Sequence, residues 1–341
     1  SVLVPLWIND RFIIQISSMM EKRITKEEIL YIIAFAVALS VRLFRLGIAP
    51  LSDFEASWAL QALDVARGAV STIGPNPGYI FSSGLIFFIF DSNELFARLL
   101  PALAGAGLVW VPYLFRRSLG HKAGLIMAFG LTLDPGLVAL SRIAGGPMLA
   151  MGFGLLAVGF WYKKNPYLSG IFGAMALLGG PYFLLGFLGL LLALVIANIL
   201  KNIGILNPLG EEFLLHPSKS QFKMWMFTFL GTIVVVGTLF LIYPQGFSAL
   251  FEALPVFLQG WLTPSGVPAS RLIAALVFYQ PLAFTFGIIA IVRGWIYRKN
   301  LSRWLSIWFI IALILSLSYQ GRLVWDIAWT LVPLWALASI E

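Results

Sequence analysis

A short acidic stretch, "APLSDFEASWALQALDVARG" at residues 49–68, directly follows the first long apolar run of the chain. It contains three carboxylates, Asp53, Glu55 and Asp64, although only 11% of all residues are charged. Carboxylates can act as general bases and arginines can bind anions, so isolated charged residues of this kind suggest a catalytic or anion-binding site. Other charged residues lie near the ends of later apolar runs: Arg98, Asp134, Arg142 and Arg322. Charged groups near the hydrocarbon boundary of a membrane are costly and often functional.

The composition indicates the environment of these residues. Of the 341 residues, 60% are hydrophobic, and the mean hydropathy is +0.91. A soluble domain is about half apolar and about a quarter charged. Apolar runs of about 17–25 residues, the length of a membrane-spanning helix, recur along the chain. We therefore expect an all-α polytopic membrane protein with a single transmembrane domain over residues 1–341.

The same composition argues against several functional classes. The chain has no cysteine, which excludes disulfides and thiolate chemistry. No His, Cys and carboxylate residues cluster at metal-ligand spacing, so we expect no cofactor and find no indication of a divalent cation. The net charge of +8 does not indicate a nucleic-acid partner, because the basic residues lie in loops between apolar runs, where they report topology.

The positions of lysine and arginine predict the topology, because cytoplasmic loops are enriched in both. A cytoplasmic N-terminal segment, residues 1–27, places most of the 23 basic residues inside, provided that residues 79–90 do not cross the membrane. That run is too short to span the bilayer comfortably. Ten spans follow from this assignment: residues 28–46, 96–115, 122–138, 143–162, 167–180, 182–200, 224–243, 272–292, 304–319 and 323–340.

Three segments then lie on the outer face. The first, residues 47–95, is predicted to hold two short surface helices, 53–67 and 79–90, joined by the turn-rich "GAVSTIGPNPG". The second is short, residues 133–142. The third, residues 244–271, has apolar residues at a spacing that predicts a helix lying in the membrane interface. Seven of the 15 acids are predicted to lie on this face: Asp53, Glu55, Asp64, Asp91, Glu94, Asp134 and Glu252.

Taken in order, these features resemble those of a known family, the GT-C membrane glycosyltransferases, in the branch of protein mannosyltransferases and aminoarabinose transferases. The resemblance rests on "SDFEASWALQALDVARG", "NELFARLLPALAGAGLVWVPYLFRRSLG", "LTLDPGLVALSRIAGGPMLAMGFGLLAVGF" and the spacing between them. These stretches cover roughly the first 160 residues. The resemblance implies a GT-C-like transmembrane helical bundle.

The resemblance also implies a function: transfer of a sugar from a polyprenyl-phosphate donor to an acceptor, with inversion, at the outer face of a prokaryotic cytoplasmic membrane. A carboxylate must accept the proton of the acceptor hydroxyl, and cations must stabilise the departing lipid phosphate. Asp53 or Glu55 is the expected base. The expected substrate-binding residues are Arg98, Asp134, Arg142 and Arg322.

Structural interpretations of the same residues stay open. The family motif is usually an adjacent Asp–Glu pair, and aligning Glu55 with it places Phe54 at the Asp position and Asp53 one residue early. Ser52 and Glu55 have the spacing of a capping box. Arg98 has the position of an interfacial arginine that snorkels. The structural alternatives for the later residues are an N-cap or turn at Asp134 and an ion pair between Arg322 and Asp326, four residues apart.

A second functional class therefore stands beside the first. It is a non-catalytic, GT-C-like accessory or structural membrane subunit of a larger complex, with other membrane-protein subunits as partners and membrane lipid around it. A transporter or channel fits less well, because charge within the spans is sparse and no two halves of the chain match.

Overall fold

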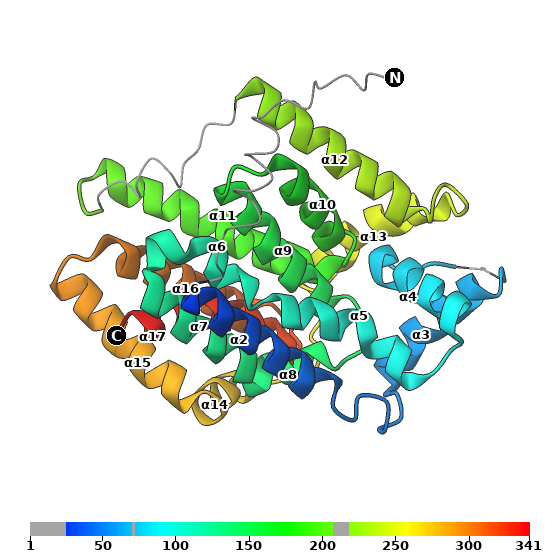
Figure 1. Ribbon diagram of the computed structural model, residues 1–341, viewed down its shortest axis with the longest axis horizontal. Coiled ribbons are helices and arrows are strands. Elements are labelled where there is room, and N and C mark those ends of the chain that lie inside the picture. The colour runs from blue at the N-terminus through cyan, green and yellow to red at the C-terminus, as the bar shows by residue number, and fades with distance from the viewer. Residues whose placement is uncertain (1–24, 70–71, 207–217) are drawn as a thin grey trace, which may run out of the picture.

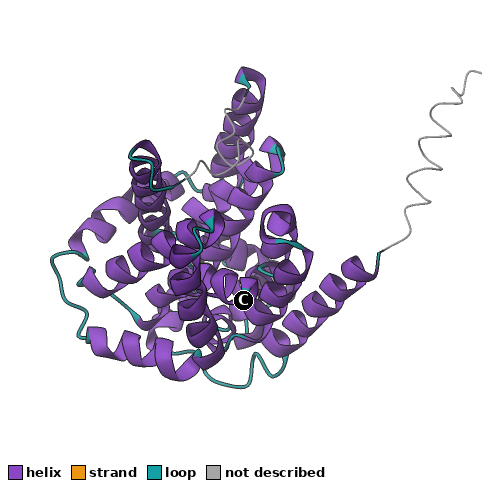
Figure 2. Cartoon of the chain, turned by 90° about the vertical axis from the view of Figure 1, so that its left-hand side faces the viewer, coloured by secondary structure: helices purple, strands orange, loops and turns teal. Residues whose placement is uncertain are grey.

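The computed structural model describes residues 25–69, 72–206 and 218–341, and every regular element within these ranges is a helix (Figures 1 and 2). The all-α prediction is therefore confirmed. Most of the predicted cytoplasmic segment 1–27, and about half of the loop that follows span 182–200, lie outside the described residues.

The first half of the chain begins with a long helix and continues through two short helices that lie side by side at one end of the molecule, α3 and α4 (Figure 1). Thr25 and Ser52 start α2 and α3 with complete capping boxes. The helices of this half are α2 (Lys26–Leu43), α3 (Asp53–Ala66), α4 (Pro77–Phe90), α5 (Glu94–Gly107), α6 (Trp110–Leu119), α7 (His121–Leu133), α8 (Pro135–Ser141) and α9 (Pro147–Tyr162).

Several helices in both halves begin with proline at their first position, where its fixed φ suits the helix and its missing N–H is not needed. The helices of the second half are α10 (Pro166–Leu177), α11 (Pro181–Asn202), α12 (Lys219–Gly237), α13 (Gln245–Gln259), α14 (Ala269–Tyr279), α15 (Pro281–Ile296), α16 (Asn300–Ser318), the 3₁₀ helix η1 (Val324–Ile327) and α17 (Ala328–Ile340).

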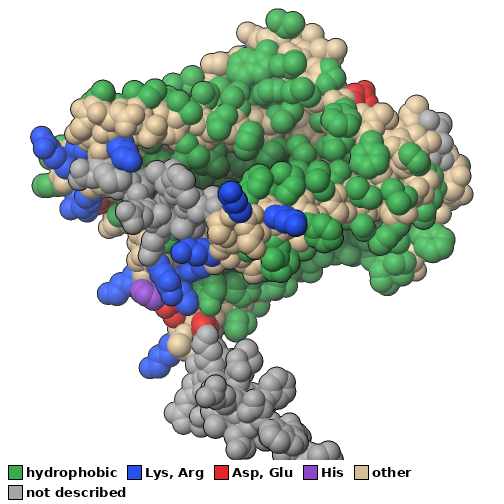
Figure 3. Space-filling model, turned by 90° about the horizontal axis from the view of Figure 1, so that it is seen from above, with side chains coloured by type: hydrophobic (Ala, Val, Ile, Leu, Met, Phe, Trp, Pro, Cys, Tyr) green, Lys and Arg blue, Asp and Glu red, His purple; other side chains and the backbone are tan. Residues whose placement is uncertain are grey.

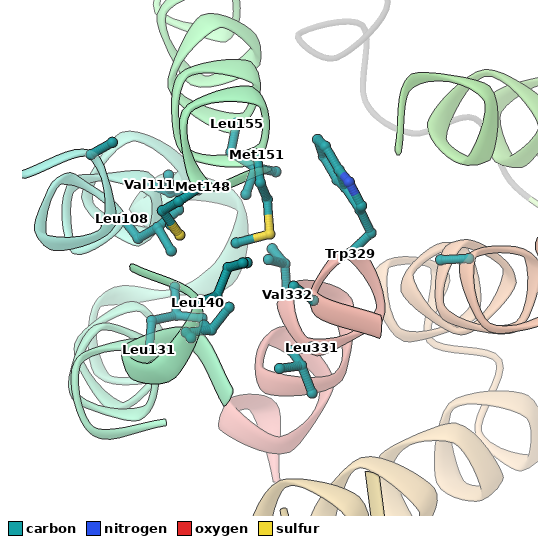
Figure 4. Close-up of a cluster of buried hydrophobic side chains, with 14 of the residues drawn as sticks. Leu108, Val111, Leu131, Leu140, Met148, Met151, Leu155, Trp329, Leu331 and Val332 are labelled. Atoms are coloured by element: carbon teal, nitrogen blue, oxygen red, sulfur yellow. The ribbon is translucent and has the colours of Figure 1, made fainter. Parts of the chain in front are cut away.

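The largest buried cluster surrounds α17, whose residues Trp329, Leu331 and Val332 pack with side chains from α6 to α9 (Figure 4). Met148 and Met151 of α9 contribute flexible side chains to this core. A second cluster joins α2 to the α5–α6 junction and α7 largely through alanine, which lets helix backbones approach closely. The last helix of the chain is thus an interior element that holds the first half in place.

The helices support a multi-pass membrane protein, but they do not confirm the number of ten spans. Four are long and apolar enough to cross a membrane, counting α5 and α6 together as Glu94–Leu119, and up to six cross if each bent pair is one span. The predicted span 272–292 is not one straight helix. It is two helices, α14 and α15, bent by 94° at Gln280 and Pro281. Proline cannot continue a helix through its interior, which explains the break.

Helices are present at both positions predicted within residues 47–95, as α3 and α4, but α4 is not a surface helix over its whole length. The apolar α4 is only 14 residues long, and its first turns are buried while its end exposes Phe88, Ile89 and Phe90. The helix predicted within residues 244–271 is α13, which buries Ala249 and Ala253 and exposes Phe251, Leu254 and Leu258. Much of the molecular surface is hydrophobic, and in the face shown in Figure 3 the basic side chains gather at one end.

Candidate active site at the start of helix α3

Glu55 forms the capping box that its spacing predicts. Its Oε2 atom accepts hydrogen bonds from the Ser52 backbone N–H and hydroxyl, both at 3.0 Å. The Ser52 hydroxyl accepts one from the Glu55 N–H at 3.4 Å. The first turn of α3 is therefore fixed locally, because these bonds satisfy backbone donors that a helix start leaves open.

Glu55 also forms a buried ion pair with Arg98 of α5. The Arg98 Nε lies 2.7 Å from Oε1 and Nη2 lies 2.8 Å from Oε2, and the two residues are 6% and 5% exposed. Oε1 accepts a further bond from the Ala144 N–H at 2.9 Å. Burial alone would raise the pKa of Glu55, but the bonds from Arg98, Ala144 and Ser52 outweigh it and hold the pKa at about 2. Glu55 is therefore a poor proton acceptor.

Arg98 has no N–H group left for a ligand. Two of its five donors bind Glu55, and the other three bind backbone carbonyl oxygens of the α2–α3 connection. Those acceptors lie 2.8–3.2 Å away: the carbonyl oxygens of Leu46, Ala49 and Pro50. The arginine ties α5 to the segment that carries the acidic motif. It holds the site together rather than facing the solvent.

Asp53 and Phe54 face different surroundings. Asp53 is the first residue of α3 and its side chain is exposed. Phe54, at the position where the resemblance expects an aspartate, points inward, and its ring centroid lies 4.9 Å from that of Trp325 and 6.1 Å from that of Trp58. Of the two candidate bases, Asp53 is thus the one with an accessible carboxylate.

Arg142 lies close to this region but binds the end of α2. Its Nη1 donates to the carbonyl oxygens of Val41, Arg42 and Phe44, and its Nη2 donates to that of Arg45. The last carbonyls of a helix have no partner within the helix, and a basic side chain can satisfy them. The structure therefore gives Arg142 a capping contact, while its neighbour Ala144 meets Glu55.

Asp134 is buried at the junction of α7 and α8, where the predicted N-cap is present. Its Oδ1 accepts from the Leu137 N–H at 2.8 Å, and its Oδ2 accepts from the Trp335 indole at 2.6 Å. These bonds connect α8 to α17. Asp134 is not in contact with Asp53, Glu55 or Arg98 through any hydrogen bond or ion pair in the described ranges.

The predicted ion pair between Arg322 and Asp326 is wrong: the described residues show none between them. Arg322 precedes the 3₁₀ helix, so the two side chains do not share an α-helical face. Arg322 instead donates to the carbonyl oxygens of Val267, Leu317 and Tyr319. Asp326, buried, accepts from the Leu323 N–H at 2.8 Å.

The sequence does not predict the contact between η1 and the start of α3. Trp325 touches Phe54, so these two segments meet in space although 270 residues separate them. Asp326, the next residue, is the single acid within an otherwise apolar stretch, residues 323–340, and such an acid is the one local signal that this stretch differs from an ordinary apolar helix.

A large apolar cavity lies within the helical bundle, and none of the charged residues described above lines it. Its volume is about 740 Å³, within the usual range of ligand pockets, and its lining is apolar apart from Ser118 and Ser169. The walls come from α6, α7, α9, α10, α11, α12, α16 and α17. One end reaches Trp329, whose indole donates to the Tyr182 carbonyl at 3.3 Å. The Tyr182 ring meets Trp325 edge-on at 6.4 Å, so packed aromatic side chains lie between the cavity and Phe54.

The part of the chain that the structure describes contains no evident set of metal ligands. No group of three or more His, Cys, Asp or Glu side chains there could hold a metal ion.

Comparison with known proteins finds no matching family model and no matching curated protein. Solved structures do match. ArnT from Cupriavidus metallidurans bound to undecaprenyl phosphate has a TM-score of 0.69 at 16% identity, over 91% of this chain and 59% of that chain. AglB from Archaeoglobus fulgidus, with an inhibitory peptide and a dolichol-phosphate, has a TM-score of 0.57 at 16% identity, over 92% and 50%.

A third match is an A. fulgidus oligosaccharyltransferase complex with Zn and sulfate, at a TM-score of 0.57, 15% identity, and 91% and 48% coverage. The chain spans about half to three-fifths of the length of these proteins. At this level of identity the likeness concerns the fold alone. The chain has the fold of the GT-C membrane glycosyltransferases, as the resemblance of its first 160 residues predicted.

Proposed function

We propose that this protein binds a polyprenyl-phosphate sugar and transfers the sugar to an acceptor at the outer face of a prokaryotic membrane. The observation that carries the proposal is the apolar cavity of about 740 Å³ within a helical bundle of this fold. A cavity of this lining suits a polyprenyl chain. Undecaprenyl phosphate and dolichol-phosphate are bound in two of the proteins that share the fold.

The general base in this proposal is Asp53. The best base has a pKa near the operating pH, and the Arg98 contact keeps the pKa of Glu55 at about 2. Asp53 has no such partner among the described residues, and its side chain is exposed. The acceptor oxygen attacks the anomeric carbon from the face opposite the lipid phosphate, and its proton passes to Asp53. The bond from the anomeric carbon to the phosphate oxygen breaks, and the lipid phosphate leaves with the electron pair, which inverts the configuration.

Arg322 is our candidate for the cation that contacts the lipid phosphate. Its Nε and Nη1 bind carbonyl oxygens, whereas no described residue accepts from Nη2. It stands three residues before Trp325, whose ring contacts that of Phe54. Arg98 and Arg142 support this arrangement indirectly, since they fix the segments that hold Asp53.

A transfer assay tests the proposal. Purified protein in lipid vesicles is supplied with undecaprenyl phosphate carrying radiolabelled mannose or glucose, with a membrane extract as the acceptor. Asp53→Asn should lower transfer by about a hundred- to ten-thousandfold, the typical contribution of a general base, and should leave donor binding intact. Glu252→Gln, at an exposed acid on α13, is the matched control. Wild-type transfer by Asp53→Asn would show that Asp53 is not the base.

One observation favours a second function, that of a non-catalytic subunit. Phe54 occupies the expected aspartate position and packs against Trp325, and the neighbouring Glu55 is fully engaged by Arg98. A protein that has the fold but no catalytic function would retain the contacts of Phe54 with Trp325 and of Glu55 with Arg98. In that case the wild-type protein transfers no lipid-linked sugar, and it co-purifies with another membrane protein whose activity depends on it.

A further inference from the structure

One end of the large apolar cavity lies at the face that the positions of lysine and arginine predict to be cytoplasmic. The lining there comes from the ends of four helices: Ser118 and Leu119 of α6, Trp161 of α9, Phe222 of α12 and Leu301 of α16. Ser118 and Phe222 are exposed, so the cavity reaches the molecular surface between these helix ends. We call this opening, lined by Ser118, Trp161 and Phe222, the inner mouth.

The helix ends around the inner mouth are basic. Residues 110–119, 159–166 and 218–226 contain no acid and six basic residues: Arg116, Arg117, Lys163, Lys164, Lys219 and Lys223. In Figure 3 the basic side chains likewise gather at one end of a largely hydrophobic face. The inner mouth therefore combines an apolar interior with a positively charged rim.

Three of these cations are available to a ligand. Arg117, Lys164 and Lys223 are exposed, and none of them forms an ion pair with a described residue. Arg117 and Lys223 are each next in sequence to a residue that lines the cavity. The hydroxyl groups of Ser118 and Tyr162 hydrogen-bond at 2.7 Å, which holds the end of α9, with Lys164, against the end of α6. The three charges thus come from three helices that surround one opening.

The depth of the cavity matches one leaflet of a membrane. Along α11 the lining runs from Phe183 to Leu194, which is about 16 Å at 1.5 Å per residue. The hydrocarbon core of a bilayer is about 30 Å thick, so one leaflet contributes about 15 Å. Phe187, within this wall, is 49% exposed, so the cavity also opens sideways on the apolar helix α11, where a membrane lipid can enter.

We propose that the cavity binds one anionic glycerophospholipid of the cytoplasmic leaflet, with an acyl chain inside the cavity and the phosphate at the inner mouth among Arg117, Lys164 and Lys223. Basic pockets between membrane helices on the cytoplasmic side bind anionic lipid head groups in this way. A zwitterionic head group carries its own cation and leaves the three charges without a net counter-charge.

The inference goes beyond the proposed function, because this lipid is not the sugar donor. Its phosphate lies at the predicted cytoplasmic face, whereas Asp53 is predicted to lie at the outer face. The proposed function assigns the same cavity to a polyprenyl chain, so the two lipid chains exclude each other. The phospholipid is then a competitor that regulates donor binding, and the positions of the two phosphates tell the lipids apart.

A quenching assay tests the head group. Protein in a neutral detergent is titrated with phosphatidylglycerol or phosphatidylcholine that carry the same brominated acyl chains, which quench tryptophan fluorescence on contact. Phosphatidylglycerol should quench saturably at one lipid per protein, and phosphatidylcholine should bind about tenfold more weakly or less. Arg117→Gln and Lys223→Gln should each weaken phosphatidylglycerol binding about fivefold. Lys26→Gln, an exposed charge on α2, which lines no part of the cavity, is the matched control.

Two variants test the position of the acyl chain. Trp225→Phe removes an indole from the cavity wall and should lower the quenched fraction, whereas Trp110→Phe, outside the wall, should not. Ala157→Phe fills the cavity and should abolish saturable quenching, with thermal unfolding as the check that the variant folds. Trp225→Phe keeps the test decisive if Ala157→Phe does not fold.

Equal binding of the two phospholipids overturns the inference. So does an equal loss of binding in Lys26→Gln and Lys223→Gln, or quenching that is unchanged in Trp225→Phe.

Titration with undecaprenyl phosphate separates this inference from the proposed transfer. If its binding falls in Lys223→Gln as that of phosphatidylglycerol does, the inner mouth holds the polyprenyl phosphate and the inference is wrong. If only phosphatidylglycerol binding falls, the inference stands. A protein that binds phosphatidylglycerol in this way and transfers no sugar supports the inference and refutes the proposed function.

Discussion

Replacing Glu55 by glutamine should destabilise the protein strongly, because Glu55 holds together parts of the chain that are far apart in sequence. Its carboxylate joins the start of α3 to Arg98 of α5 and to Ala144 of the α8–α9 connection. Glutamine has nearly the same shape and keeps one acceptor oxygen. It removes the negative charge, so Arg98 remains buried without its counter-charge.

The size of the effect follows from the pKa. A carboxyl whose pKa is about 2 in the folded state, against an ordinary value near 4.3, contributes about 3 kcal/mol to stability at neutral pH. Breaking a buried ion pair by removing one partner typically costs about 3–5 kcal/mol, which agrees. Because the pKa is lowered on folding, this contribution is complete above about pH 4.3 and is lost as the pH falls toward 2.

Thermal unfolding in detergent measures the effect. Glu55→Gln should lower Tm by about 4–7 °C at pH 7, and the difference from wild type should shrink as the pH is lowered below 4. Glu252→Gln on exposed α13 is the control for losing one carboxylate. A double-mutant cycle with Arg98→Met isolates the coupling between the two side chains. A Tm shift no larger than that of Glu252→Gln, or no coupling, would refute the reasoning.

Two further predictions concern the end of α2 and the topology. Arg142→Gln removes hydrogen bonds to four carbonyl oxygens at the end of α2. It should destabilise the folded protein by about 1–3 kcal/mol in the same thermal unfolding assay. An unchanged stability would show that solvent satisfies those carbonyl oxygens equally well. The chain has no natural cysteine, so in intact cells a cysteine at Ser92 should react with a membrane-impermeant thiol reagent and one at Ser118 should be shielded. Ready labelling at Ser118 would refute the topology.

The sequence alone determined the features that depend on local chemistry. Hydropathy identified an all-α membrane protein, because a helix in lipid must be apolar over its own length. The spacing of Ser52 and Glu55 predicted the cap of α3, and Asp134 before Pro135 predicted an N-cap, because capping bonds join residues three apart. The order of motifs in the first 160 residues pointed to the fold that the solved structures share.

Only the tertiary structure decided which partner each charged side chain takes. Arg98 meets a carboxylate 43 residues away, and Arg142 meets carbonyl oxygens about 100 residues away. The resemblance implies that both arginines bind the substrate. In the folded chain, oxygen atoms of the protein accept their hydrogen bonds instead. The ion pair expected between Arg322 and Asp326 does not form, because a 3₁₀ turn replaces the α-helix that the four-residue spacing assumes.

The buried polar atoms without a partner lie furthest from what sequence could predict. Among the described residues they include the indole nitrogens of Trp58 and Trp325 and the amide of Asn76, and each residue looks ordinary in its own segment: a tryptophan in a short helix, a tryptophan in an apolar stretch and an asparagine before a proline. Nothing local distinguishes a polar atom that has a partner from one that does not. That difference arises when distant helices pack and exclude every other partner, which is a property of the folded chain.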